Sequence, residues 1–147
     1  MACFHAVLRS TCGLQDLEAY VIGASAMVVL LSPDYFTRLW CVYELCCFFA
    51  HHPVTAATAY TWGFADALGA KAASEQQTEA SAAGMERLIA SVRSFTVKTS
   101  GCKYEADRIF LLRKVGEFYK SVEAFERFAR WSGIAIAVFG LMLSPAV

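Results

Sequence analysis

Charged side chains are scarce in this chain of 147 residues: they make up 18% of it, against 57% hydrophobic residues. A composition this apolar excludes an intrinsically disordered chain, because disorder requires low hydrophobicity and high net charge. The 13 basic and 13 acidic residues give a formal net charge of zero, which argues against a general nucleic-acid binder. The length is sufficient for one domain with its own hydrophobic core.

No two cysteines stand in a C-x-x-C spacing, although the chain holds six of them. Cys41, Cys46 and Cys47 fall within one apolar stretch, whereas a secreted disulfide framework spaces its cysteines through loops. We therefore expect reduced, mostly buried thiols in a cytosolic setting. Cys47 and His51 have the i, i+4 spacing of a metal-binding pair, but no known spacing assembles four ligands here, so we predict no metal site.

Several other signatures are also missing. The first 12 residues have neither a long apolar run nor a small-residue cleavage site, so no secretory signal is visible. The chain has no Gly-rich phosphate loop, no internal repeat and no Ser/His/Asp ordering that suggests a catalytic triad. Residues 71–84 contain no large apolar side chain, so this segment is either a solvated helix or a flexible insertion.

The most informative stretch is residues 27–52. It opens with the apolar run Met27–Leu31, which is short and partly β-branched and predicts a strand buried on both faces. Ser32, Pro33 and Asp34 then predict the end of the strand and the start of a helix. Serine can cap a helix, proline suits its first position, and aspartate complements the positive end of its dipole.

The helix that follows is predicted to bury one face. Four side chains recur at steps of four, three and four and therefore share that face: Phe36, Trp40, Tyr43 and Cys47. We expect Trp40 to pack in the core and Cys41 to be an inert thiol. Glu44 is set among aromatic, aliphatic and thiol side chains. It is either a helix-surface residue, a buried acid paired with a basic residue of the last helix, or a functional carboxylate.

The remaining elements are predicted from periodicity and capping signals. Helix–strand–helix order with a fully apolar strand is typical of an open parallel sheet. Two amphipathic helices have predicted inward residues: Leu17, Tyr20, Val21 and Ala24 in residues 15–24, and Ile109, Leu112, Val115 and Phe118 or Tyr119 in residues 103–118. The other expected elements are strands at residues 54–62 and 92–98, a short helix at residues 86–91, and a helix restart at Ser121.

Residues 131–147 carry no charged side chain. A membrane-spanning helix needs about 20 residues, so this segment is marginal in length. Arg127 and Arg130 precede it and Trp131 lies at its edge, as at a membrane boundary with the N-terminal side cytosolic. We predict a helix that continues from residues 121–130, stays exposed or weakly packed, and partitions into a bilayer. A buried C-terminal helix is the alternative.

Residues 28–36, VVLLSPDYF, and residues 39–45, LWCVYEL, together resemble one block of Toll/interleukin receptor (TIR) homology domains. In that family, the third strand and the helix after it read as an apolar strand, Ser-Pro, an aromatic residue and then Trp-Cys-x-x-Glu-Leu. The matching positions in this chain are Ser32, Pro33, Trp40, Cys41, Glu44 and Leu45. The resemblance is specific over residues 27–48 and loose elsewhere.

The resemblance implies an α/β fold with a partial flavodoxin-like parallel sheet and flanking helices, to which the apolar C-terminal helix is added. Residues 1–130 would form the TIR-like domain, and residues 131–147 the apolar, membrane-spanning or buried segment. Complete TIR domains begin with a strand, a helix, a second strand and a loop. Only 26 residues precede Met27, so we expect the family's first strand and that loop to be missing.

The functional implication is a signalling and protein-interaction module on the cytoplasmic side of a membrane, anchored through residues 131–147. Its partners would be other TIR-like domains or a second copy, and not nucleic acid. The alternative is an NAD hydrolase that cleaves the nicotinamide–ribose bond, with NAD as substrate and no cofactor. In TIR hydrolases the essential glutamate occupies the position of Glu44. The module is favoured, because one carboxylate without a formed pocket supplies little transition-state stabilisation.

Overall fold

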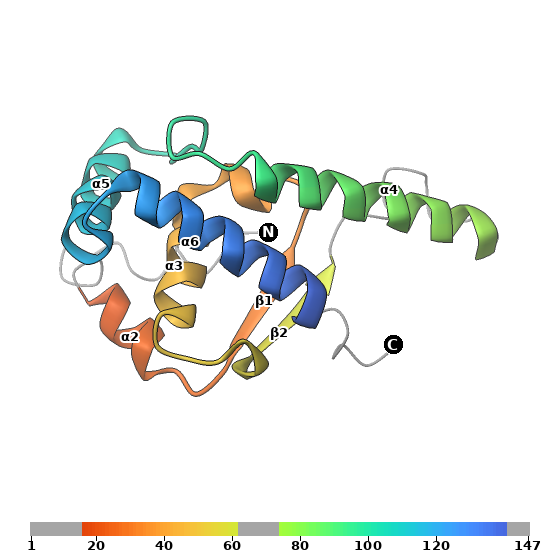
Figure 1. Cartoon of the computed structure of the whole chain (residues 1–147), viewed down its shortest axis with the longest axis horizontal. Helices are drawn as coiled ribbons and strands as arrows, with labels where there is room; N and C mark the ends of the chain where they lie inside the picture. Colours follow the sequence, from red (N-terminus) through yellow and green to blue (C-terminus); the bar gives the residue numbers. More distant parts are fainter. Residues whose placement is uncertain (1–15, 62–73, 141–147) are drawn as a thin grey trace.

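The computed structural model describes residues 16–61 and 74–140, and these contain five α-helices and a two-stranded parallel sheet (Figure 1). The strands are β1 (Met27–Leu31) and β2 (Ala57–Thr61), which pair in register from Met27 opposite Ala57 to Leu31 opposite Thr61. Helix α3 (Leu39–Phe49) connects them, as a crossover must between parallel strands. The predicted mixed α/β fold and both strands of this unit are therefore confirmed.

The prediction that β1 is buried on both faces is wrong. Val29 and Leu31 face the core and are 3% and 0% exposed, whereas Val28 and Leu30 on the opposite face are 66% and 52% exposed. On β2, Tyr60 shares this outer face because it pairs with Leu30, and it is 37% exposed. A fully apolar strand predicts two covered faces, but this sheet has one covered face and one open one.

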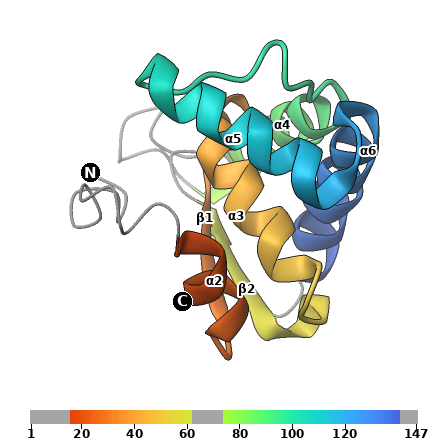
Figure 2. The ribbon, with the colours of Figure 1, turned by 90° about the vertical axis from the view of Figure 1, so that its left-hand side faces the viewer.

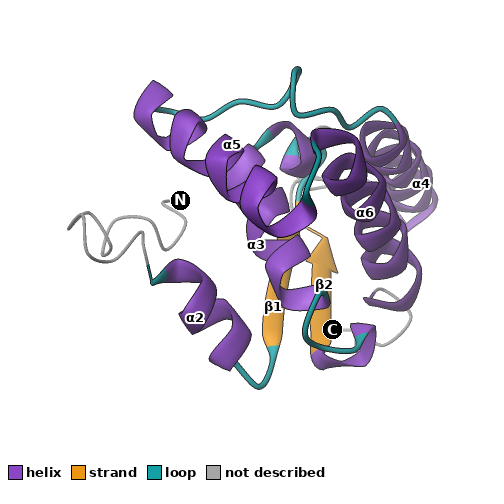
Figure 3. Ribbon diagram, turned by 60° about the vertical axis from the view of Figure 1, so that its left-hand side comes forward, coloured by secondary structure: helices purple, strands orange, loops and turns teal. Residues whose placement is uncertain are grey.

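Helix α3 is the centre of the hydrophobic core. Figures 2 and 3 show it between α2 (Leu17–Gly23) and α6 (Val122–Ala135), and it also contacts α5 (Glu105–Tyr119). Ten of its eleven residues are buried. A helix that is apolar on all sides requires this surrounding, because any side left open would expose large hydrophobic groups to water.

The helix begins later than the sequence predicts. A short 3₁₀ turn, η2 (Tyr35–Thr37), follows β1, and Arg38 is then extended, with φ of −107° and ψ of 105°. The extension lets Gly101 bridge this segment. The Gly101 N–H donates to the Thr37 carbonyl at 2.7 Å, and the Leu39 N–H donates to the Gly101 carbonyl at 3.0 Å. A distant part of the chain therefore interrupts the single helix that local signals predict.

Ser32 and Pro33 consequently belong to the turn after β1 and not to the first turn of α3. The Ser32 hydroxyl donates to Asp34 Oδ1 at 2.5 Å, and the Ser32 carbonyl accepts from the Tyr35 N–H at 3.0 Å. The predicted end of the strand at this Ser-Pro pair is confirmed, while its predicted role as the cap of the long helix is wrong.

The predicted strand at residues 92–98 is also wrong. Helix α4 (Ser74–Arg93) includes the first two of these residues, and the segment after it turns. Phe95 and Val97 are buried nonetheless, at 2% and 3% exposure, which accounts for their strand-like apolar alternation. The same helix includes residues 74–84 and 86–91, so the helical alternative is confirmed for that part of the chain.

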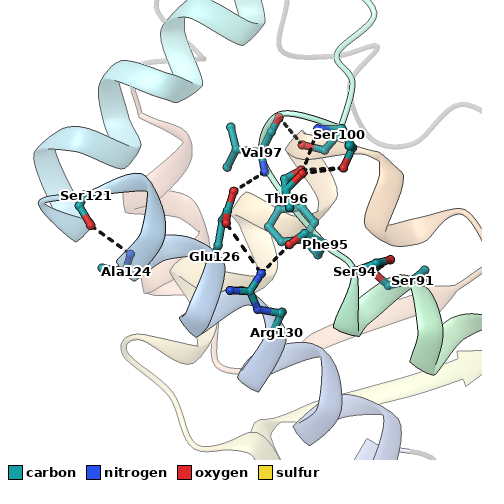
Figure 4. Close-up of polar contacts among 11 residues, drawn as sticks. Ser91, Ser94, Phe95, Thr96, Val97, Ser100, Ser121, Ala124, Glu126 and Arg130 are labelled. Atoms are coloured by element: carbon teal, nitrogen blue, oxygen red, sulfur yellow. Dashed lines mark hydrogen bonds and ion pairs between the residues drawn. The ribbon is translucent and has the colours of Figure 1, made fainter.

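Charged side chains from α5 and α6 hold this turning segment in place, and Figure 4 shows the two from α6, Glu126 and Arg130. The Val97 N–H donates to Glu126 Oε1 at 2.8 Å, and Arg130 donates to the Phe95 carbonyl at 2.7 Å. Arg108 donates to the carbonyls of Ser100 and Val97 at 2.6 and 2.9 Å. Hydrogen bonds of this kind are stronger than neutral ones, and here they satisfy backbone groups that a neighbouring strand would satisfy in a sheet.

The predicted inward faces of the short helices are partly wrong. In α5, Val115 is buried as predicted, but Ile109 is 63% exposed. Of the two alternatives at its end, Tyr119 packs against the core and Phe118 is 54% exposed. In α2, Leu17 is buried as predicted, whereas Tyr20 is 62% exposed. Each helix contains apolar residues on more than one side, so the sequence pattern leaves the choice of face to tertiary packing.

Helix α6 begins at the predicted cap, where the Ala124 N–H donates to Ser121 Oγ at 3.1 Å. The helical continuation predicted beyond Arg130 is confirmed as far as the structure describes it: α6 ends at Ala135, and a π-helical turn, η5 (Ile136–Gly140), follows. One face of this part is buried, in Ser132, Gly133, Ala135, Ile136 and Ala137. It is therefore packed and not an exposed rod.

Among the helices that the structure describes, none has the length and hydropathy needed to cross a membrane. Residues 141–147 of the predicted apolar segment lie outside the described residues.

Candidate functional site

Trp40, Cys41 and Leu45 of the predicted motif are core residues of α3. Trp40 is 7% exposed, its indole N–H donates to Asp107 Oδ2 at 3.2 Å, and its ring stacks on Phe110 with centroids 6.2 Å apart. Cys41 is buried and Leu45 is fully buried. The prediction that Trp40 packs in the core is thus confirmed, and this motif fixes α3 against α5.

The cysteines of α3 are free thiols in the hydrophobic core. Burial raises the pKa of Cys47 to about 12 and that of Cys46 well above its ordinary value. Both thiols are therefore protonated at neutral pH and poorly nucleophilic. The expectation of reduced, buried thiols is confirmed for Cys41, Cys46 and Cys47. Within residues 16–61 and 74–140, no three histidine, cysteine or acidic side chains gather as a metal site would require.

Glu44 differs from its neighbours on α3, because it is the one residue of this helix that is not buried. Burial raises the pKa of the partly exposed Glu44 carboxyl from 4.5 to about 7, and the Arg38 guanidinium opposes this shift. With the residues that the structure describes, the Glu44 carboxyl forms no hydrogen bond or ion pair. A carboxyl of this pKa holds a proton about half of the time at neutral pH and can accept or donate one.

The buried acid paired with a lysine is Glu18, a residue that sequence reasoning missed. Lys114 Nζ of α5 lies 2.9 Å from Glu18 Oε2, and the Tyr43 hydroxyl of α3 donates to Glu18 Oε1 at 2.7 Å. Burial, and then the hydrogen bond to Glu18, raises the pKa of Tyr43 well above its ordinary value. The cluster of Glu18, Tyr43 and Lys114 joins α2, α3 and α5.

Both Glu18 carboxylate oxygens have a donor, which is the condition under which a buried charge is tolerated. The sequence contains a weak signal for this cluster, since Tyr43 was predicted to face inward and Glu18 directly follows the inward Leu17. Sequence spacing alone does not show which acidic side chain contacts Tyr43, because Tyr43 and Glu18 lie on different helices.

The chain matches no known family model, and neither the search of curated proteins nor that of solved structures finds a match.

Proposed function

We propose that this chain is a TIR-like protein-interaction module that associates with a second copy of itself. The order of β1, the Ser-Pro turn, α3 and the parallel strand β2 supports this proposal, because it is the arrangement that the TIR-like block implies. The single observation that carries it is the outer face of the sheet, defined by Val28, Leu30 and Tyr60.

This outer face is apolar and open. Val28, Leu30 and Tyr60 are 66%, 52% and 37% exposed, and the register places Tyr60 directly opposite Leu30. Parallel sheets are normally covered on both faces, and neighbouring exposed apolar groups mark interaction surfaces. A second copy would cover each face with an identical one, which removes both from water.

The test is the oligomeric state of the purified chain over a range of concentrations, measured by sedimentation velocity. We expect reversible self-association that Leu30→Lys abolishes, because a lysine would place a charge in the centre of the contact. The matched control is Ile109→Lys on α5, at a residue that is 63% exposed, and it should associate like the wild type. A wild-type chain that stays monomeric, or equal loss of association in both variants, would contradict the proposal.

Glu44 supports a second candidate function, hydrolysis of NAD. Its carboxyl is partly exposed, forms no hydrogen bond with the described residues, and has a pKa of about 7. Cleavage of the nicotinamide–ribose bond passes through an oxocarbenium-like state, which a nearby carboxylate stabilises. The interaction module remains the first choice, because the described structure supplies this one carboxylate and no further group assigned to NAD.

This second function is tested by following nicotinamide release from NAD at several protein concentrations. If Glu44 acts as a carboxylate, turnover should rise with pH through about 7 as the group ionises. Glu44→Ala should abolish turnover and leave the helix intact, because alanine is the better helix former. Glu44-dependent turnover by the dilute monomer would reverse our ranking, whereas the absence of turnover at every concentration would remove the hydrolase.

A further inference from the structure

A second apolar surface lies on the outer side of α6 and η5, and its side chains are separate from Val28, Leu30 and Tyr60 of the proposed sheet contact. We call the stripe the four side chains Trp131, Ile134, Val138 and Phe139, which are 52%, 46%, 44% and 54% exposed. The first three recur at steps of three and four, so they share one side of the helix.

Packing on the opposite side holds the stripe outward. Ser132, Gly133 and Ile136 are buried between exposed members of the stripe. At Gly133 the approach is so close that a Cβ atom would lie 2.6 Å from Phe36 Cζ and 2.7 Å from Val92 Cγ1. Figure 1 shows α6 crossing the near side of the molecule in front of α3. The helix is therefore fixed on the domain by one face, and the stripe is presented by the other.

Trp131 packs against two other aromatic side chains, Phe128 and Phe49. Its ring stacks on Phe128 with centroids 5.6 Å apart and an interplanar angle of 22°, and it meets Phe49 edge-on at 6.5 Å. About half of the indole remains open. A tryptophan with one apolar side and one solvated side is well suited to the boundary between lipid headgroups and hydrocarbon.

The polarity of the helix changes at Trp131. Arg127 is exposed one turn before it, and Arg130 is engaged with Glu126 and the Phe95 carbonyl. No charged residue occurs from 131 to 147. Protein contacts are normally ringed by polar side chains, whereas this surface is charged at one end and apolar beyond it. That order complements a bilayer, where phosphates lie above the hydrocarbon.

We infer that the stripe docks on the surface of a lipid bilayer. Trp131 lies at headgroup level, Ile134, Val138 and Phe139 enter the hydrocarbon boundary, and Arg127 contacts phosphate oxygens. Binding of this kind scales with the buried apolar area and with attraction to anionic lipids. The positive charge of Arg127 is offset by the acidic Glu123 four residues earlier. The apolar contact should therefore dominate.

Vesicle flotation tests this inference with the full chain and with two lipid compositions, phosphatidylcholine alone and phosphatidylcholine with phosphatidylserine. The wild type should float with both. Ile134→Ser with Val138→Ser should lower the partition coefficient on the order of tenfold or more, because two apolar side chains no longer insert. The control, Ile109→Ser with Phe118→Ser, removes two apolar groups from α5 that are more exposed than Ile134 and Val138, and it should float like the wild type.

A second measurement does not depend on that double variant. The fluorescence emission of the wild type should move to shorter wavelength on addition of vesicles, and Trp131→Phe should lose the change. Failure of the wild type to float with either composition would overturn the inference, as would equal flotation of the stripe and control variants. It would also be overturned if the stripe variant lost only self-association in sedimentation, because the occupant would then be a second copy.

Discussion

Two stretches of this chain have nearly the same apolar composition and opposite surroundings. Helix α3, LWCVYELCCFF, contains one charged residue, and residues 131–139, WSGIAIAVF, contain none. Ten of the eleven α3 residues are buried. In the second stretch, Trp131, Ile134, Val138 and Phe139 are exposed while the residues between them are buried. Hydropathy alone would rank the second stretch as at least as deeply buried as the first.

The difference comes from how the neighbours of each helix are arranged around it, since both helices contact several other elements. Helix α3 is the crossover between β1 and β2 and has further helices on its other sides. Helix α6 is an outer element, so only its inner face is covered (Figure 3). Apolar composition thus determines how much hydrophobic surface a helix has available for burial. Topology determines how much of the helix circumference is covered by neighbouring elements.

The largest expected contrast is between the two tryptophans of these helices. Trp40→Ala should lower the free energy of unfolding by about 3–5 kcal/mol, because it leaves a cavity against Phe110 and removes the donor to Asp107. Trp131→Ala should cost about 1 kcal/mol, mainly in lost ring contacts. Chemical denaturation of both variants measures the contrast. Equal shifts of the two midpoints would show that the outer helix is as tightly packed as the central one.

The same contrast applies to two neighbouring basic residues of α5. Lys114→Met should cost about 3–5 kcal/mol, because Glu18 would remain buried with only the Tyr43 hydroxyl as a partner. Arg113→Met removes an exposed pair with Glu117 at 3.7 Å and should cost less than about 1 kcal/mol. Denaturation midpoints of both variants at neutral pH measure the two losses of stability. A small loss for Lys114→Met would show that water reaches the cluster of Glu18, Tyr43 and Lys114.

Glu44 should make stability depend on pH. Its pKa is raised from 4.5 to about 7 in the folded chain, so the folded state keeps a proton that the unfolded state releases in this window. Stability should therefore fall as pH rises from about 4.5 to 7 and stay lower above it, by about 1–3 kcal/mol relative to Glu44→Gln. Denaturation of both proteins across this range measures the difference. Parallel pH profiles would mean that Glu44 is solvated.

The smallest changes in stability are expected at two glycines, one against the core on α6 and one on the exposed side of α5. Gly133→Ala should cost about 1–3 kcal/mol, because the new methyl group overlaps Phe36 and Val92. Gly116→Ala on the exposed side of α5 has nothing within 4 Å and should stabilise the chain by about 0.5–1 kcal/mol through helix propensity. Thermal unfolding of the two variants should therefore shift in opposite directions. A stabilising Gly133→Ala would show that α6 can move away from the core.

Local signals predicted well wherever a few adjacent residues determine the outcome. The apolar run of β1, its end at Ser32 and Pro33, the second parallel strand and the Ser121 cap all follow from such signals. Part of the candidate site could be predicted: Trp40 and Cys41 were expected in the core and are buried there. The partner of Tyr43 was missed, because Glu18 lies 25 residues away in the sequence.

By itself, the sequence determined that this chain folds around an apolar strand and an apolar helix, because their side chains have no stable place in water. Only the tertiary structure decided that the sheet has one open face, that Arg38 interrupts the helix, and that residues 95–100 turn without forming a strand. Each of these outcomes depends on contacts between distant segments. The bridge from Gly101, the hydrogen bonds donated by Arg108 and Arg130, and the one accepted by Glu126 satisfy backbone groups that local propensity would have assigned to regular structure.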